Sequence, residues 1–210
     1  ELTKKSDGVL YTSDGRDIEM SVASTKAFYS QIAAGILLGL AIADATNGPL
    51  ADVRRLDKRN KLLLALREIP NLMRKVLLEQ QKISQIAAEL APAKKYWAVV
   101  GNGFNIVAAK EIRIKLSELC YKSIAADFTE DKKHIDLSAE PLILVCAAGL
   151  EGSVSIDAAK EVAIYRAHKA SPIVITNDVE AFPSALKVIE VPSTVPELAF
   201  VLSTMAGHLF

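Results

Sequence analysis

Apolar and polar positions follow a helical pattern over residues 52–94. This stretch is charged and rich in Leu, and its apolar positions recur every three or four residues, as at Leu62, Leu63 and Leu66. Such spacing predicts amphipathic helices. We expect Pro70 to separate a first helix from a second one that runs toward Leu90. We interpret the stretch as helices that connect two α/β units, or as the first helices of the second unit.

From residue 96 onward, short apolar runs alternate with helical segments of ten or more residues. This alternation predicts an α/β fold, a doubly wound parallel sheet of about five strands with helices on both faces. The expected strands are Tyr96–Val100, Ser123–Ala126 at an edge, Pro141–Ala147, Pro172–Thr176 and Val188–Val191. The expected helices cover about 105–121, 153–169 and 197–208. Ligands of such folds bind beyond the carboxyl ends of the strands, which are here 101–103, 127–134, 148–153 and 176–178.

The most apolar stretch of the chain is Ile32–Ala43. Its twelve residues are fewer than the roughly 20 that a helix needs to cross a bilayer, so we expect no membrane partner. A helix that is apolar nearly all round lies in a core or in a subunit interface. We therefore expect the chain to associate, most simply as a homodimer.

Charge and cysteine content narrow the class of protein. The 25 Lys and Arg balance the 25 Asp and Glu, which argues against a nucleic-acid partner. Two cysteines, Cys120 and Cys146, cannot form a disulfide scaffold, and free thiols favour a cytoplasmic protein. His168 and His208 lie 40 residues apart, and without ligand spacing we expect no metal and no cofactor.

Small residues precede the apolar helix at Ala23, Ser24 and Thr25. Free backbone N–H groups and hydroxyls at the start of a helix form a ready site for an anion or a sugar hydroxyl. The alternative is a capped helix whose hydroxyls satisfy only their own backbone.

The run Val22–Phe28, V-A-S-T-K-A-F, is followed by Gln31 and resembles the glucosamine-6-phosphate synthase family. The isomerase half of that family consists of two SIS (sugar isomerase) domains. The resemblance implies that this run follows the last strand of a first SIS domain and contacts a sugar phosphate, with Val22, Ala23 and Ser24 as substrate-binding residues. It also implies that residues 1–60 are the end of a first SIS domain with connecting helices, and that residues 61–210 are a second SIS domain.

A second match is Lys115–Tyr121, K-L-S-E-L-C-Y, which is similar to a Lys-Leu-Lys-Glu-Ile-Ser-Tyr run of that family. The resemblance implies that Glu118 is the catalytic glutamate, which moves a proton between C1 and C2 of the sugar, and that Lys115 lies near the same site. The ring-opening histidine of the family follows its tyrosine by thirteen residues, a spacing that leads here to His134. In the family this histidine comes from the other subunit of a dimer.

Both assignments have a plain alternative. Glu118 could be a solvated carboxylate or an ion-pair partner of Arg113, Lys115 or Lys122, and His134 could be a solvated histidine in the charged segment E-D-K-K-H-I-D. In the family, Gly and Pro follow the histidine, whereas Ile and Asp follow His134 in this chain. Ser117 replaces the second lysine of the family run.

Two functions follow from the resemblance. In the first, the chain is part of an enzyme that converts fructose 6-phosphate to glucosamine 6-phosphate with glutamine-derived ammonia, and a glutaminase domain completes the protein. In the second, it is a non-catalytic module that binds a phosphosugar for regulation or dimerisation. The family's phosphate loop would precede Glu1 and its Schiff-base lysine would follow Phe210. We therefore expect a piece of a longer protein that has no turnover by itself.

Overall fold

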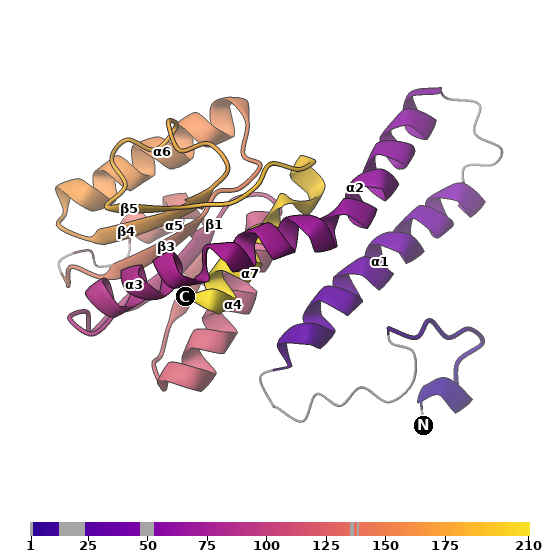
Figure 1. The fold of residues 1–210 in the computed structure, drawn as a ribbon, viewed down its shortest axis with the longest axis horizontal. Helices are drawn as coiled ribbons and strands as arrows, with labels where there is room; N and C mark the ends of the chain where they lie inside the picture. The colour runs from indigo at the N-terminus through magenta and orange to yellow at the C-terminus, as the bar shows by residue number, and fades with distance from the viewer. Residues whose placement is uncertain (1, 13–23, 47–52, 135–136, 138) are drawn as a thin grey trace. The chain divides into compact units, whose positions relative to one another are not determined.

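All five strands of the sheet run in the same direction. The computed structural model describes residues 2–12, 24–46, 53–134, 137 and 139–210. The strands are β1 (Trp97–Gly101), β2 (Ala125–Asp127), β3 (Leu142–Cys146), β4 (Ser171–Thr176) and β5 (Lys187–Glu190). Their order is β2-β1-β3-β4-β5, and each neighbouring pair is parallel. The predicted α/β class is confirmed (Figure 1).

The order of the strands reverses between β1 and β3, because the chain first adds β2 on one side of β1 and then adds β3 on the other. This reversal is the topological switch point at which ligands of open α/β sheets bind. Every residue of β3 and β4 is buried, as expected for central strands covered on both faces.

Helices cover both faces of this sheet. They are α3 (Gln80–Leu90), α4 (Asn105–Cys120), α5 (Thr129–His134), α6 (Gly152–Ala167) and α7 (Pro196–Leu209), preceded by η1 (Leu2–Lys4), α1 (Thr25–Thr46) and α2 (Val53–Leu78). On one face, Val100, Ile143 and Val145 form a core with Val162 and Tyr165 of α6. Strand side chains alternate between faces, and α4 and α7 pack together against the strands.

The prediction that Pro70 ends a helix is wrong. Pro70 lies inside α2, and the break falls instead at Glu79, between α2 and α3. Pro70 is exposed, whereas Ile69, Leu72 and Val76 are buried. The buried face holds the helix in place, and water can satisfy the carbonyl that loses its partner at the proline.

The chain divides into two compact units, Glu1–Leu63 and Leu64–Phe210. The core and the sheet belong to the second unit. In the first unit, Arg59 of α2 donates to Asp44 Oδ2 of α1 from Nε at 3.0 Å, and its Nη2 lies 3.0 Å from the same oxygen.

Helix α1 is longer than the apolar run that predicted it. It has 22 residues, none of them buried in this structure. By length and composition alone it could cross a membrane, but core helices of soluble proteins and signal sequences pass the same test, so one such helix is weak evidence for a membrane span.

The turn from β1 to α4 requires glycine at position 101. A Cβ atom at Gly101 would lie 2.4 Å from the backbone oxygen of Asn105. We predict that Gly101→Ala lowers the free energy of unfolding by about 1–3 kcal/mol, as overpacking does, measured by urea unfolding. The exposed Lys110→Ala on α4 is the control and should change it by less than about 0.5 kcal/mol. An unchanged urea midpoint for Gly101→Ala would contradict the tight turn.

Candidate functional site

A buried asparagine joins three segments at the carboxyl edge of the sheet, next to the switch point. Asn105, the first residue of α4, is 2% exposed. Its Nδ2 donates to the backbone oxygen of Ala148 after β3 at 2.8 Å, and its Oδ1 accepts from Ser203 Oγ of α7 at 2.9 Å. The loops after β1 and β3 are therefore held close together, as a site at this edge requires.

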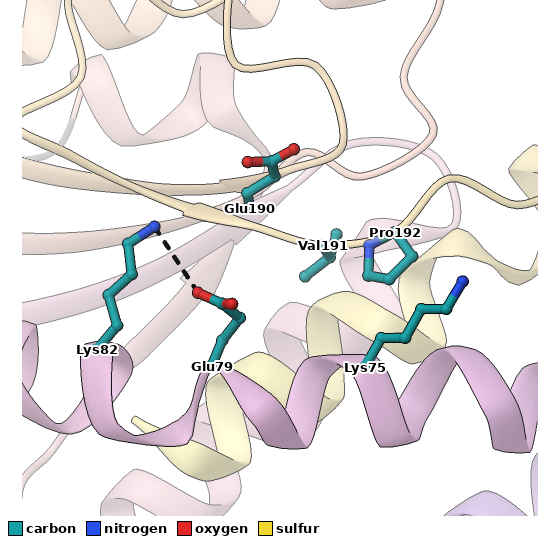
Figure 2. Close-up of a pocket in the computed structure, with 6 residues that line it drawn as sticks. All are labelled: Lys75, Glu79, Lys82, Glu190, Val191 and Pro192. Atoms are coloured by element: carbon teal, nitrogen blue, oxygen red, sulfur yellow. Dashed lines mark ion pairs between the residues drawn. The ribbon is translucent and has the colours of Figure 1, made fainter.

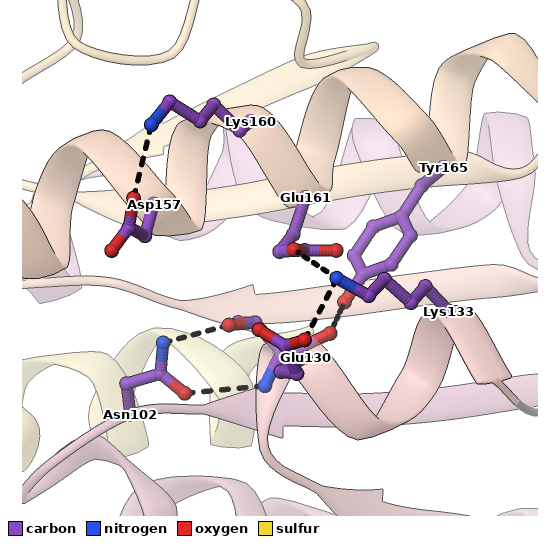
Figure 3. Close-up of polar contacts among 8 residues, drawn as sticks. Asn102, Glu130, Lys133, Asp157, Lys160, Glu161 and Tyr165 are labelled. Atoms are coloured by element: carbon purple, nitrogen blue, oxygen red, sulfur yellow. Dashed lines mark hydrogen bonds and ion pairs between the residues drawn. The ribbon is translucent and has the colours of Figure 1, made fainter.

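Polar side chains also fasten α5 to this edge (Figure 3). Asn102 Nδ2 donates to Thr129 Oγ1 at 2.7 Å, and the Thr129 N–H donates back to Asn102 Oδ1 at 3.2 Å. The Tyr165 hydroxyl of α6 donates to the backbone oxygen of Thr129. Lys133 lies between two carboxylates, at 2.8 Å from Glu130 Oε1 and 3.0 Å from Glu161 Oε1.

The structure places Glu118 and His134 on opposite faces of the sheet, because α4 packs with α7 on one face and α5 packs with α6 on the other. Helix α4 begins at the carboxyl end of β1 and runs back, so Glu118 lies thirteen residues from Asn105, or about 20 Å along the helix axis. His134 is the last residue of α5, which follows the carboxyl end of β2. Both side chains are exposed. Within one chain, these two residues do not form one site.

Glu118 is an exposed carboxylate near the end of α4. Among the residues that the structure describes, it has no ion-pair partner, and two of its expected partners are engaged elsewhere. Lys115 pairs with Glu111 at 3.2 Å. Lys122 donates to the Lys94 carbonyl at 2.9 Å and lies 4.2 Å from the centre of the Trp97 ring.

Lys115 belongs to a largely buried cluster of charged side chains that the sequence analysis did not predict. Glu111 Oε1 lies 3.2 Å from Lys115 Nζ and 3.5 Å from His208 Nε2 of α7, and all three side chains are only 10–11% exposed. Burial lowers the pKa of His208, and the nearby Glu111 carboxylate partly opposes this shift. The i,i+4 spacing of Glu111 and Lys115 could have predicted their pairing. No sequence pattern near Glu111 could have predicted the contact with His208.

The expected sugar-binding residues are only partly described. Val22 and Ala23 lie outside the described residues. Ser24 directly precedes α1, is half-buried, and has a left-handed backbone with φ of 33°.

Neither cysteine forms a disulfide. Cys120 is exposed and Cys146 is buried, and burial raises the pKa of the Cys146 thiol to about 12. In the described part of the chain, no group of three or more His, Cys, Asp or Glu side chains is placed to hold a metal ion.

A pocket of about 400 Å³ lies beside the end of β5, where sequence reasoning proposed no site (Figure 2). It is lined by Lys75, Glu79 and Lys82 and by the segment 190–192. Lys82 and Glu79 are 3.8 Å apart. Two lysines and two glutamates line the pocket, so its charge favours neither an anionic nor a cationic ligand.

The fold is that of sugar isomerase domains. The C-terminal domain of glucosamine-fructose-6-phosphate aminotransferase from Francisella tularensis superposes with a TM-score of 0.77 at 23% identity, over 92% of this chain and 54% of that one. The sugar isomerase domain of an RpiR transcription factor from Sphaerobacter thermophilus gives 0.54 at 12% identity, over 70% and 87%. No protein-family model matches the chain.

The sequence relatives are glutamine–fructose-6-phosphate aminotransferases (isomerizing), which confirms the resemblance. The enzyme of Mycolicibacterium smegmatis is 30% identical over 217 residues, covering 100% of this chain and 33% of the relative. Human enzyme 2 is 28% identical over 197 residues, covering 91% and 27%. The chain thus spans a third or less of the length of these relatives.

The buried histidine predicts a pH dependence of stability. Because its pKa is lowered in the folded state, the unfolded chain binds more protons, and stability is lost as pH falls through the ordinary value of 6.5. We predict that the free energy of unfolding falls between pH 7 and 5.5, and that His208→Gln removes most of this slope. His168→Gln, at an exposed site, should keep it. An equal slope in both variants, measured by urea unfolding at each pH, would refute the assignment.

Proposed function

We propose that this chain is the isomerase part of an enzyme that converts fructose 6-phosphate to glucosamine 6-phosphate, using ammonia from a glutaminase domain of the same protein. The observation that carries the proposal is Glu118, an exposed carboxylate without an ion-pair partner among the described residues, one turn after Lys115 on α4. The relatives, which are named for fructose 6-phosphate aminotransfer and isomerisation, support it. We propose a cytoplasmic enzyme, in keeping with the free thiols.

His134 would open the sugar ring. An imidazole accepts and donates protons near neutral pH, so it can remove the proton of the anomeric hydroxyl and return a proton to the ring oxygen as the C2–O5 bond breaks. The product is the open-chain ketone, which ammonia then attacks to give a C2 imine and water.

Glu118 would carry out the proton transfer that follows. Its carboxylate takes a proton from C1 of the imine while the imine nitrogen gains a proton, giving an enolamine. It then returns a proton to C2 as the C1 hydroxyl loses its own proton and becomes the aldehyde. Exposure at the end of α4 leaves this carboxylate accessible to a ligand bound by another domain or another copy.

The two residues would meet only in an assembly. Because Glu118 and His134 lie on opposite faces of one sheet, we propose that a homodimer brings Glu118 of one copy near His134 of the other. Lys115, held by Glu111 at 3.2 Å, would add positive charge beside the bound sugar phosphate.

A non-catalytic phosphosugar-binding module is the second candidate. The observation that favours it is the absence of the family's Gly-Pro turn after His134, where Ile and Asp follow. In that case fructose 6-phosphate would bind to the full-length protein, as calorimetry would detect, without turnover.

Replacing the proposed proton carrier tests the first candidate. In the full-length protein, Glu118→Gln should lower kcat for hexose-6-phosphate isomerisation by about 10²–10⁴-fold and leave KM within about twofold, because the amide keeps the shape but cannot accept the proton. The matched control is Glu180→Gln, at another exposed glutamate. Binding of fructose 6-phosphate with an unchanged kcat in Glu118→Gln would overturn the assignment.

Subunit mixing tests whether two copies share the site. Glu118→Gln and His134→Asn proteins, each inactive alone, should regain about a quarter of wild-type activity after mixing and exchange, because half the dimers are mixed and each has one intact site. If activity does not recover in a mixture that is shown to exchange subunits, the proposal is contradicted, and both residues of each site would come from the same copy.

A further inference from the structure

Helix α5 cannot hold its own position. It has six residues, and His134 is the last of them. Helices this short are unstable in water without tertiary contacts. The orientation of His134 therefore depends on what fastens α5 to the rest of the domain.

Three contacts fasten the first turn of α5. The buried Thr129, 2% exposed, exchanges two hydrogen bonds with Asn102 after β1, at 2.7 and 3.2 Å. Its backbone oxygen accepts the hydroxyl of Tyr165 from α6. Figure 3 shows these bonds reaching the start of α5 from two sides, one from the sheet and one from the helix above it.

The hydroxyl of Tyr165 is a dependable donor. Tyr165 is fully buried. Burial raises its pKa above the ordinary value, and the nearby carboxylates of Glu161 and Asp127 raise it further. The side chain thus stays neutral at physiological pH, and its O–H can donate to Thr129 throughout.

The last turn of α5 and the chain beyond it are fastened to the same helix. Lys133, adjacent to His134, lies 3.0 Å from Glu161 Oε1 of α6, and its ion pairs with Glu130 and Glu161 raise its pKa. Leu137, three residues after His134, is 6% exposed and packs in the core cluster that contains Tyr165 and Val162. His134 thus lies between two segments that are both held against α6.

We propose that Tyr165 is a positioning residue for His134, because through Thr129 it sets the place of α5. The inference rests on the proposed function of His134 in ring opening. Tyr165 touches neither the substrate nor the imidazole in this scheme. It acts on the ring-opening step alone, because that is the step that His134 performs.

Two substrates separate this step from the later ones. Fructose 6-phosphate must open its ring, whereas 5-deoxyfructose 6-phosphate lacks O5, cannot close the furanose ring, and needs no opening. In the full-length protein, we expect Tyr165→Phe to lower kcat for fructose 6-phosphate on the order of tenfold or more, as a small misplacement of a catalytic group does. It should leave KM and the turnover of the 5-deoxy substrate within about twofold.

The matched control removes another buried hydroxyl. Thr204 Oγ1 donates to the Phe200 carbonyl within α7 at 2.8 Å, so Thr204→Val loses a bond of the same kind in a helix that packs against α4. It should leave both substrates unaffected. Asn102→Ala, which loosens α5 from the side of the sheet, should reproduce the pattern of Tyr165→Phe and serves if that variant folds poorly.

The results distinguish the proposed role of His134 in ring opening from the proposed positioning role of Tyr165. If His134→Asn spares the turnover of fructose 6-phosphate, the proposed role of His134 fails, and this inference with it. If His134→Asn shows the substrate-selective loss while Tyr165→Phe and Asn102→Ala do not, only the positioning role fails. Equal losses on both substrates in Tyr165→Phe would mean a merely structural role and would also overturn it.

Discussion

The parallel direction of the strands is the constraint on which the candidate site depends. A helix that joins two parallel strands must begin at the carboxyl edge of the sheet and return to the amino edge. Helices α4 and α5 both follow this rule, but α4, which carries Glu118, packs with α7 on one face of the sheet, whereas α5, which carries His134, packs with α6 on the other. Within one such domain, the sheet lies between the two residues. A shared site therefore needs a second copy or another domain.

The same constraint explains where the polar contacts gather. Near the carboxyl edge, Asn102 donates to Thr129 Oγ1, Asn105 donates to the Ala148 carbonyl, and the Tyr165 hydroxyl donates to the Thr129 carbonyl. Each of them satisfies a backbone or hydroxyl group that would otherwise be buried alone. These hydrogen bonds connect the loops after β1 and β3 with the starts of α4 and α5.

The fold was largely predictable, because its signals are local. The apolar runs around β3 and β4 and the helices between them follow from composition along a few residues. Pro70 misled because its ring faces water while Ile69 and Val76 hold α2 in the core, a tertiary effect that overrides a local propensity. The contacts of Tyr165 with Thr129 and of His208 with Glu111 join residues 36 and 97 positions apart. Local sequence patterns cannot predict contacts between residues so far apart in the chain, because only folding brings them together.

The most direct test of the shared site is the distance between positions 118 and 134 within and between chains. Spin labels at these two positions, in a full-length protein with the exposed Cys120 replaced by Ser, allow both distances to be measured by pulsed electron resonance. The account predicts that the separation between the two copies is clearly shorter than the separation within one chain. A shorter distance within one chain than between chains would contradict it.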